Sequence, residues 1–282
     1  MSRAMSIHIG VNRPCHRQAG GRPLQYSEIT AWRMAELANQ AGYDSLQVLQ
    51  GQAATRSAVL QALSGAAGVM SQGDTLLVTF SGHGVPLPDQ DGDERDGLDE
   101  SWCLADSTLR DDELAEHWRL FERGVRIAVV AESCYSGGSG RDDKDYVCVP
   151  PRPGGGQRFR GTRGAGMDDQ EAGNPCIVEA ASDDDDIRAS VLLLAASGEK
   201  QSAHDGVFTR YLLDVWQDGT FRGSYCNLFR EVHRRVTAEY SSQHPQLKML
   251  GAPDPEFSMA PAFHRDGTTR GARYRGAIRM VG

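Results

Sequence analysis

A histidine and a cysteine follow two of the most apolar segments of the chain, and together they have the residue types of a nucleophilic site. The segment "TLLVTF" runs directly into Ser81-Gly82-His83-Gly84, and "VRIAVVA" runs directly into Glu132-Ser133-Cys134. A thiol becomes a strong nucleophile when a base removes its proton or a nearby cation lowers its pKa, and an imidazole within hydrogen-bond reach does either. Cys134 is therefore the candidate nucleophile and His83 the candidate base.

Each of these two residues has an ordinary explanation when it is taken alone. A lone histidine in a glycine-rich turn is more often a surface or packing residue, and a lone cysteine at the end of a strand is more often a buried core thiol. Both residues, however, end apolar runs and lie in glycine-rich turns. Such glycines let backbone approach a substrate and leave N–H groups free to face an oxyanion, so the combination favours a catalytic pair.

The elements that must position this pair are strands alternating with helices. Helical patterns occur at residues 28–41, which precede Gly42, in the segment that Thr55 can cap, and in the apolar spacings within 114–121 and 208–216. Strands that alternate with such helices predict a doubly wound, mostly parallel sheet of the α/β class. The carboxyl ends of its strands would bring His83 and Cys134 to one edge. Five apolar runs are predicted strands: Ser6–Val11, Ser45–Leu49, Thr75–Phe80, Val125–Ala131 and Val191–Ala196.

Four sequence blocks then point to a known family. "LLVTFSGHG", "DQDGDERDGLDESWCLAD", "LRDDELAE" and "GVRIAVVAESCYSGGSG" resemble the type I metacaspases of the caspase-like clan, and the likeness weakens at "SIHIGVN" and at "LLLAASGEKQSAHDGVFTRYLL". The 51 residues between His83 and Cys134 (134 − 83) also fit that clan. The resemblance implies a caspase-like α/β/α sandwich and peptide-bond hydrolysis through an acyl-enzyme. It also implies an oxyanion hole made by the backbone N–H groups of Gly84 and Cys134.

The same resemblance implies a pocket for a basic side chain of a protein substrate. Its members would be Ser81 and Glu132, where the family usually has Asp at the second position; Arg is favoured over Lys because a carboxylate binds it bidentately. Thr30 stands where the family has another acid, and Tyr135 where it usually has His. The alternative for Glu132 is an exposed acid at the end of a strand.

Acidic residues crowd the segment after the first motif, which suits Ca²⁺ because that ion prefers hard oxygen ligands. An EF-hand is not supported, since Glu94 stands where its loop requires glycine. The resemblance implies instead an activating Ca²⁺ site, with no cofactor obligatory for the chemistry. Its ligands would be Asp99, Asp111, Asp112 and Asp142; the alternative is a solvated acidic loop.

A long segment rich in Gly, Pro and Arg divides the chain, so we expect a larger catalytic part at 1–149, a flexible linker at 150–188 and a smaller part at 189–282 that completes the same domain. The linker is a candidate processing site of a zymogen, cut by the enzyme itself or by an upstream protease, or else an uncleaved insertion. Its candidate cleavage residues are Arg152, Arg158, Arg160 and Arg163. The weakly patterned stretch from Pro253 is expected to be a loosely held tail.

Composition excludes several other classes of partner. The 282 residues carry a formal net charge of −8, which argues against nucleic-acid binding. No apolar run approaches the ~20 residues that span a membrane and the start lacks a signal-peptide core, so we expect a cytoplasmic protein without a membrane partner. Two alternatives to a peptidase stay open: a catalytically silent caspase-like module that binds Ca²⁺ or a protein, and another cysteine hydrolase such as a thioesterase.

Overall fold

The computed structural model describes residues 2–14, 23–89, 97–134, 186–198, 201–264 and the backbone of 278–281. In this part of the chain seven strands form one sheet in the order β10-β2-β1-β3-β7-β8-β9, in which every neighbouring pair is parallel except β8 and β9. The predicted mostly parallel α/β sheet is therefore confirmed. Its strands are β1 (Ala4–Gly10), β2 (Ser45–Gln50), β3 (Thr75–Ser81), β7 (Arg126–Glu132), β8 (Ser190–Ala195), β9 (Gln246–Gly251) and β10 (Ile278–Val281).

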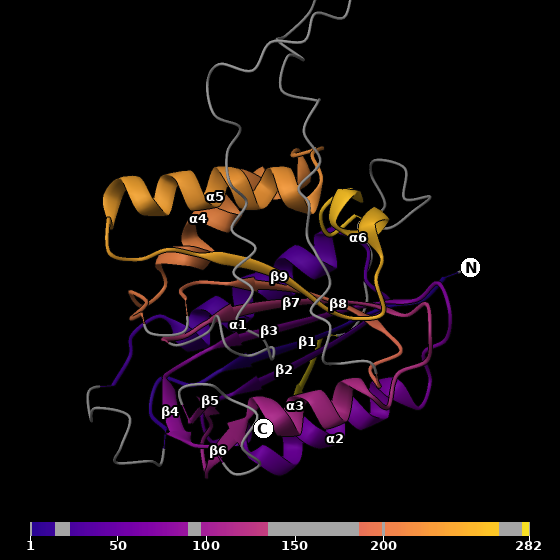
Figure 1. Ribbon diagram of the computed structural model, residues 1–282, viewed down its shortest axis with the longest axis horizontal. Helices are drawn as coiled ribbons and strands as arrows, with labels where there is room; N and C mark the ends of the chain where they lie inside the picture. The colour runs from indigo at the N-terminus through magenta and orange to yellow at the C-terminus, as the bar shows by residue number, and fades with distance from the viewer. Residues whose placement is uncertain are drawn as a thin grey trace, which may run out of the picture.

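Helices cover both faces of this sheet, as Figure 1 shows. One face packs against α1 (Ser27–Gln40), α4 (Val207–Trp216), α5 (Tyr225–Glu239) and α6 (Pro255–Met259), and the other against α2 (Arg56–Ala67) and α3 (Asp111–Trp118). Alternate residues of each central strand enter the two cores, with Leu77 and Val130 facing α1 and α4, and Val78 and Val129 facing α2 and α3. Burial on both faces explains why these strands are continuously apolar in sequence.

The predicted helix boundaries have clear local causes. Thr55 accepts a hydrogen bond from the backbone N–H of Ala58 at 3.2 Å and so caps α2. After α1, Gly42 adopts a φ of 83°, a left-handed conformation that favours glycine. Two short 3-10 turns, η1 (Gly51–Ala53) and η3 (Gln217–Gly219), complete the connections.

A second, three-stranded antiparallel sheet lies at the carboxyl edge of the main sheet, and the sequence did not predict it. Its strands are β4 (Gly84–Pro88), β5 (Leu98–Cys103) and β6 (Thr108–Arg110). Phe80 of β3 stacks on Trp102 of β5 with ring centroids 4.5 Å apart, and the N–H of Cys103 donates to the carbonyl of His83 at 2.9 Å. These contacts hold the turn that carries His83.

The expectation of a loosely held tail from Pro253 is wrong for the described part of it. Phe257 and Phe263 are fully buried in the core beside α5, and β10 pairs with β2 in parallel. Asp254 caps α6 by accepting from the N–H of Phe257 at 3.2 Å and also pairs with Arg126 at 2.7 Å. A few anchoring side chains, rather than a periodic pattern, therefore fix this segment. No helix among the described residues is long and apolar enough to cross a membrane.

Candidate active site

The register between β3 and β7 brings the two candidate catalytic residues to the same edge. Ser81 and Glu132 are direct Cα partners at the ends of these neighbouring strands, and the N–H of Gly82 donates to the carbonyl of Glu132 at 3.2 Å. His83 and Cys134 each stand two positions beyond this pair. Both residues are half-buried, so they remain open to solvent.

The turn that carries His83 packs directly on the backbone of the cysteine. A β-carbon built on Gly84 would lie 2.0 Å from the carbonyl oxygen of Cys134 and 3.3 Å from Cβ of Ser133. No L side chain tolerates the first distance, so glycine is required here for steric reasons. The close approach leaves the two glycine-rich turns in contact beside the thiol.

The loop that precedes α4 also reaches the thiol, and sequence reasoning did not assign it a role. The backbone N–H of Ala203 donates to Sγ of Cys134 at 3.4 Å. Ser197 donates from its hydroxyl to the carbonyl of Ser133 at 3.2 Å. The fully buried Gln243 accepts from the N–H of His204 at 3.0 Å and donates to the carbonyl of Ala196 at 3.0 Å. The side chain of Gln243, which lies just before β9, and that of Ser197, at the start of the loop, therefore hold this loop against Cys134.

Glu132 is buried and not the exposed acid of the alternative reading, because only 3% of its surface is accessible. Its Oε1 accepts from the backbone N–H of Thr209, in the first turn of α4, at 3.2 Å. Oε2 is buried without a hydrogen bond to any described residue. Burial raises the pKa of Glu132 to about 7, and the hydrogen bonds from the start of α4 oppose this shift.

Three serine hydroxyls at this edge of the sheet, those of Ser27, Ser81 and Ser133, are likewise buried and lack a hydrogen-bond partner in the described part of the chain. Ser81 is the Cα partner of Glu132 on one side and of Gly10 on the other. Ser27, at the start of α1, packs on Gly10, whose added β-carbon would lie 2.5 Å from the Ser27 carbonyl. Sequence reasoning missed Ser27, because only the fold places α1 across the end of β1.

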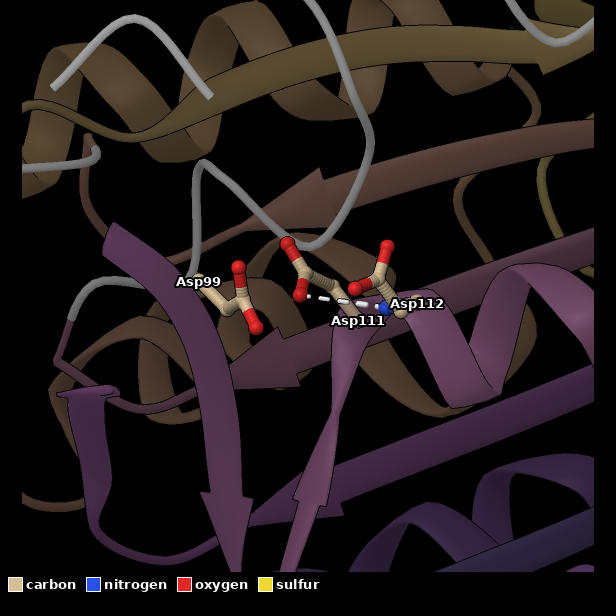
Figure 2. A group of neighbouring side chains, drawn as sticks. All are labelled: Asp99, Asp111 and Asp112. Atoms are coloured by element: carbon tan, nitrogen blue, oxygen red, sulfur yellow. Dashed lines mark hydrogen bonds between the residues drawn. The ribbon is translucent and has the colours of Figure 1, made fainter. Parts of the chain in front are cut away.

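The predicted acidic cluster comes together from two elements, as Figure 2 shows. Asp99 belongs to β5, whereas Asp111 and Asp112 begin α3, and each offers an oxygen within 4.8 Å of the others. The N–H of Asp112 donates to Oδ1 of Asp111 at 3.1 Å. Asp99 and Asp111 are buried, so these two are not part of a solvated loop.

This cluster fits a hard divalent cation. Oδ1 of Asp99 is buried and accepts no hydrogen bond from the described residues, while Oδ2 pairs with the guanidinium of Arg110. Burial raises the pKa of Asp99, with Arg110 opposing the shift and the charges of Asp112 and Asp89 adding to it. Carboxylates that repel one another in this way suit Ca²⁺.

Several predicted site residues lie outside the described part of the chain. They are the fourth proposed metal ligand, the residue after the nucleophile and the candidate processing sites: Asp142, Tyr135, Arg152, Arg158, Arg160 and Arg163. The larger-part, linker and smaller-part division stays a prediction as well. The strands on either side of the linker, β7 and β8, are neighbours in the sheet.

Comparison with known proteins shows which family the site region resembles. Residues 29–140 match the family model described as metacaspase, peptidase C14 domain. This stretch, which contains the described site residues Ser81, His83, Glu132 and Cys134, is therefore similar to the peptidase domain of metacaspases.

Individual relatives agree with that resemblance. Metacaspase-1B of Aspergillus oryzae is 35% identical over 88 residues, 29% of this chain, and Metacaspase-7 of Arabidopsis thaliana is 36% identical over 93 residues, 32% of this chain. The matches span 21% and 23% of those relatives, so the chain covers little of their length. A protein from Geobacter sulfurreducens of known crystal structure is 29% identical with a TM-score of 0.69, over 93% of this chain and 98% of that one.

Proposed function

We propose that the chain is a cysteine endopeptidase that cleaves proteins after Arg, and less readily after Lys, with Cys134 as nucleophile and His83 as base. The observation that carries the proposal is the register of β3 and β7. Ser81 pairs with Glu132, so the two turns bearing His83 and Cys134 leave the sheet side by side. The contact of Gly84 with the Cys134 carbonyl supports the same arrangement.

The chemistry would proceed in two steps. His83 takes the thiol proton as Sγ of Cys134 attacks the scissile carbonyl, and it then protonates the leaving amine. The backbone N–H groups of Gly84 and Cys134 donate to the oxyanion of each tetrahedral intermediate. Water, deprotonated by His83, then hydrolyses the thioester and restores the free thiol.

The proposed preference for a substrate with a basic residue follows from two buried oxygens, at the ends of β3 and β7, that accept or donate no hydrogen bond among the described residues. Oε2 of Glu132 and the hydroxyl of Ser81 are buried and without partners among the described residues. Leaving buried polar atoms unsatisfied is unfavourable, and a guanidinium would satisfy both with charge-assisted hydrogen bonds. An Asp-directed pocket would instead require basic side chains at this position.

Calcium is proposed as an activator rather than as a reactant. Asp99, Asp111 and Asp112 would hold the ion, whose charge offsets the mutual repulsion of their carboxylates. Asp142 is the proposed fourth ligand. The ion would stabilise the junction of α3 with β5, the strand whose Trp102 and Cys103 hold the His83 turn.

Processing of the linker is the proposed regulatory step. An enzyme that cuts after Arg would accept its own Arg152, Arg158, Arg160 or Arg163 as substrates, as would an upstream protease of the same preference. Incubating the purified chain with and without Ca²⁺ and sequencing new N-termini tests this step. New ends after these residues in the wild type, absent in Cys134→Ala, indicate self-processing; an intact wild type under both conditions contradicts it.

The resemblance also supports, by analogy, a regulated proteolytic or cell-death role in the cytoplasm.

One assay separates the peptidase from a silent binding module or a thioesterase. Fluorogenic peptides ending in Arg, Lys or Asp are offered to the wild type, to Cys134→Ala and to Cys103→Ala, a control that removes another free cysteine. We expect Arg cleavage that is lost in the Cys134 variant and retained in the control. Absence of peptide cleavage, with or without Ca²⁺, would refute the proposal, and ester turnover without peptide cleavage would identify the thioesterase.

A further inference from the structure

The residues proposed above for the primary specificity pocket carry little negative charge. One oxygen of Glu132 accepts a hydrogen bond from the N–H of Thr209, and the pKa of about 7 leaves this carboxyl only partly ionised near neutral pH. The family acid expected at Thr30 is absent, and Thr30 itself is buried. A basic side chain would therefore meet less than one full charge from the residues named above.

Asp205 is a second carboxylate near Glu132. It belongs to the loop that contacts the thiol, two residues after Ala203 and immediately before Gly206, the N-cap of α4. Glu132 binds the first turn of that same helix. The charge of Asp205 is close enough to Glu132 to contribute to the raised pKa of that residue, behind burial as the main cause.

The orientation of Asp205 is fixed by the segment just before α1. Its Oδ2 accepts from the backbone N–H of Gln25 at 2.7 Å and of Tyr26 at 3.2 Å, just before α1. Gly206 packs so closely on this segment that an added β-carbon would lie 2.8 Å from Cβ of Tyr26. Both hydrogen bonds use one oxygen, so Oδ1 has no hydrogen-bond partner among the residues that the structure describes.

We propose that Asp205 supplies the second carboxylate of the primary specificity pocket, so that the basic side chain of a substrate binds between Glu132 and Asp205. The inference rests on the proposed function and names a specificity-determining residue of that same site. Two carboxylates that repel each other when the pocket is empty gain more from a cation than either would alone. In this chain Asp205 thus takes over the charge that Thr30 does not provide.

The test compares substrates with Arg and with citrulline, its neutral isostere, at the cleaved position. Asp205→Asn keeps an oxygen for the N–H groups of Gln25 and Tyr26 but removes the charge. We expect the Arg-to-citrulline ratio of kcat/KM to fall by ~10-fold or more, mainly through a higher KM for Arg. Asp214→Asn, which removes an exposed acid of α4, serves as the matched control and should keep the wild-type ratio.

The outcomes separate this inference from the proposed function. A wild type that cleaves no Arg peptide defeats the proposed function and the inference with it. A wild type that prefers Arg, together with an Asp205→Asn variant of unchanged ratio, overturns the inference alone. An equal fall in kcat/KM on both substrates also overturns the inference, because it would show that Asp205 only fastens its loop to the segment before α1. If the Asn variant unfolds, Asp205→Ser and Asp205→Glu are compared, and the ratio must fall for Ser and persist for Glu.

Discussion

Gly84 lies against the carbonyl of Cys134 so closely that a β-carbon on Gly84 would stand 2.0 Å from that oxygen. Gly84, the residue after the candidate base, is therefore in direct contact with the backbone of the candidate nucleophile, although the two are fifty positions apart in the chain (134 − 84). This contact ties the position of one turn to that of the other.

Replacing Gly84 by Ala should abolish most activity while the protein still folds. The new methyl group must displace the Cys134 peptide, and a shift of about 1 Å in a catalytic group costs on the order of 100-fold in rate. The measurement is kcat/KM on an Arg peptide, with far-UV circular dichroism to verify folding. Gly65→Ala is the control, since nothing lies within 4 Å of its added carbon. An active Gly84→Ala enzyme would show that the turns do not need this contact.

Glu132 should make folding and activity respond to pH in opposite directions. Its pKa rises from 4.5 to about 7 in the folded protein, so between these values the folded state binds more protons than the unfolded state. Stability contributed by the protonated carboxyl is thus present below about pH 4.5 and lost as the pH rises towards 7, by up to about 3 kcal/mol. Binding of an Arg substrate needs the ionised form, so KM should fall over the upper part of the same range.

The substitution Glu132→Gln isolates both effects. Gln keeps an oxygen for the N–H of Thr209 but does not ionise, so unfolding in urea at pH 5 and pH 8 should show a smaller loss of stability on going to pH 8. Arg cleavage should drop at pH 8 as well. The exposed Glu36→Gln is the control and should behave as the wild type does. An unchanged pH dependence in Glu132→Gln would mean that another group is responsible.

Asp112 should be needed for stabilisation by Ca²⁺. Millimolar Ca²⁺ is expected to raise the Tm of the wild type, because the ion binds only where Asp99, Asp111 and Asp112 are brought together by folding. Asp112→Asn should lose this rise, as followed by calorimetry, while Asp218→Asn, far from the cluster, should retain it. A wild-type Tm that ignores Ca²⁺ would contradict the proposed site.

Trp102 should anchor the small sheet to the main one. The stacked ring on Phe80 is buried, so Trp102→Ala is expected to cost about 3–5 kcal/mol of unfolding free energy. Trp102→Phe keeps an aromatic ring for the stack and should cost less. Urea unfolding of both variants measures the difference; equal costs would mean that a phenyl ring at this position restores none of the lost packing, which would contradict the proposed role of the stack.

The sequence predicted the central strands closely and the small sheet not at all. Long apolar runs such as residues 75–80 and 125–131 have few alternatives to a buried parallel strand, and they match β3 and β7 to within one residue at each end. The short strands β4 to β6 carry no such run. Their order depends on the Phe80–Trp102 stack and on contacts made across the chain.

What the sequence alone determined is the chemistry available: a thiol and an imidazole, each placed after a buried strand, with glycines beside them. Only the tertiary structure decided which groups share the site. It buried Glu132 under the start of α4, brought Ser27 to the end of β1, and set Asp205 between the nucleophile's loop and α1. The physical reason is that hydrophobic periodicity specifies strands and helices locally, whereas burial, pKa and polar partners arise from contacts between residues far apart in the chain.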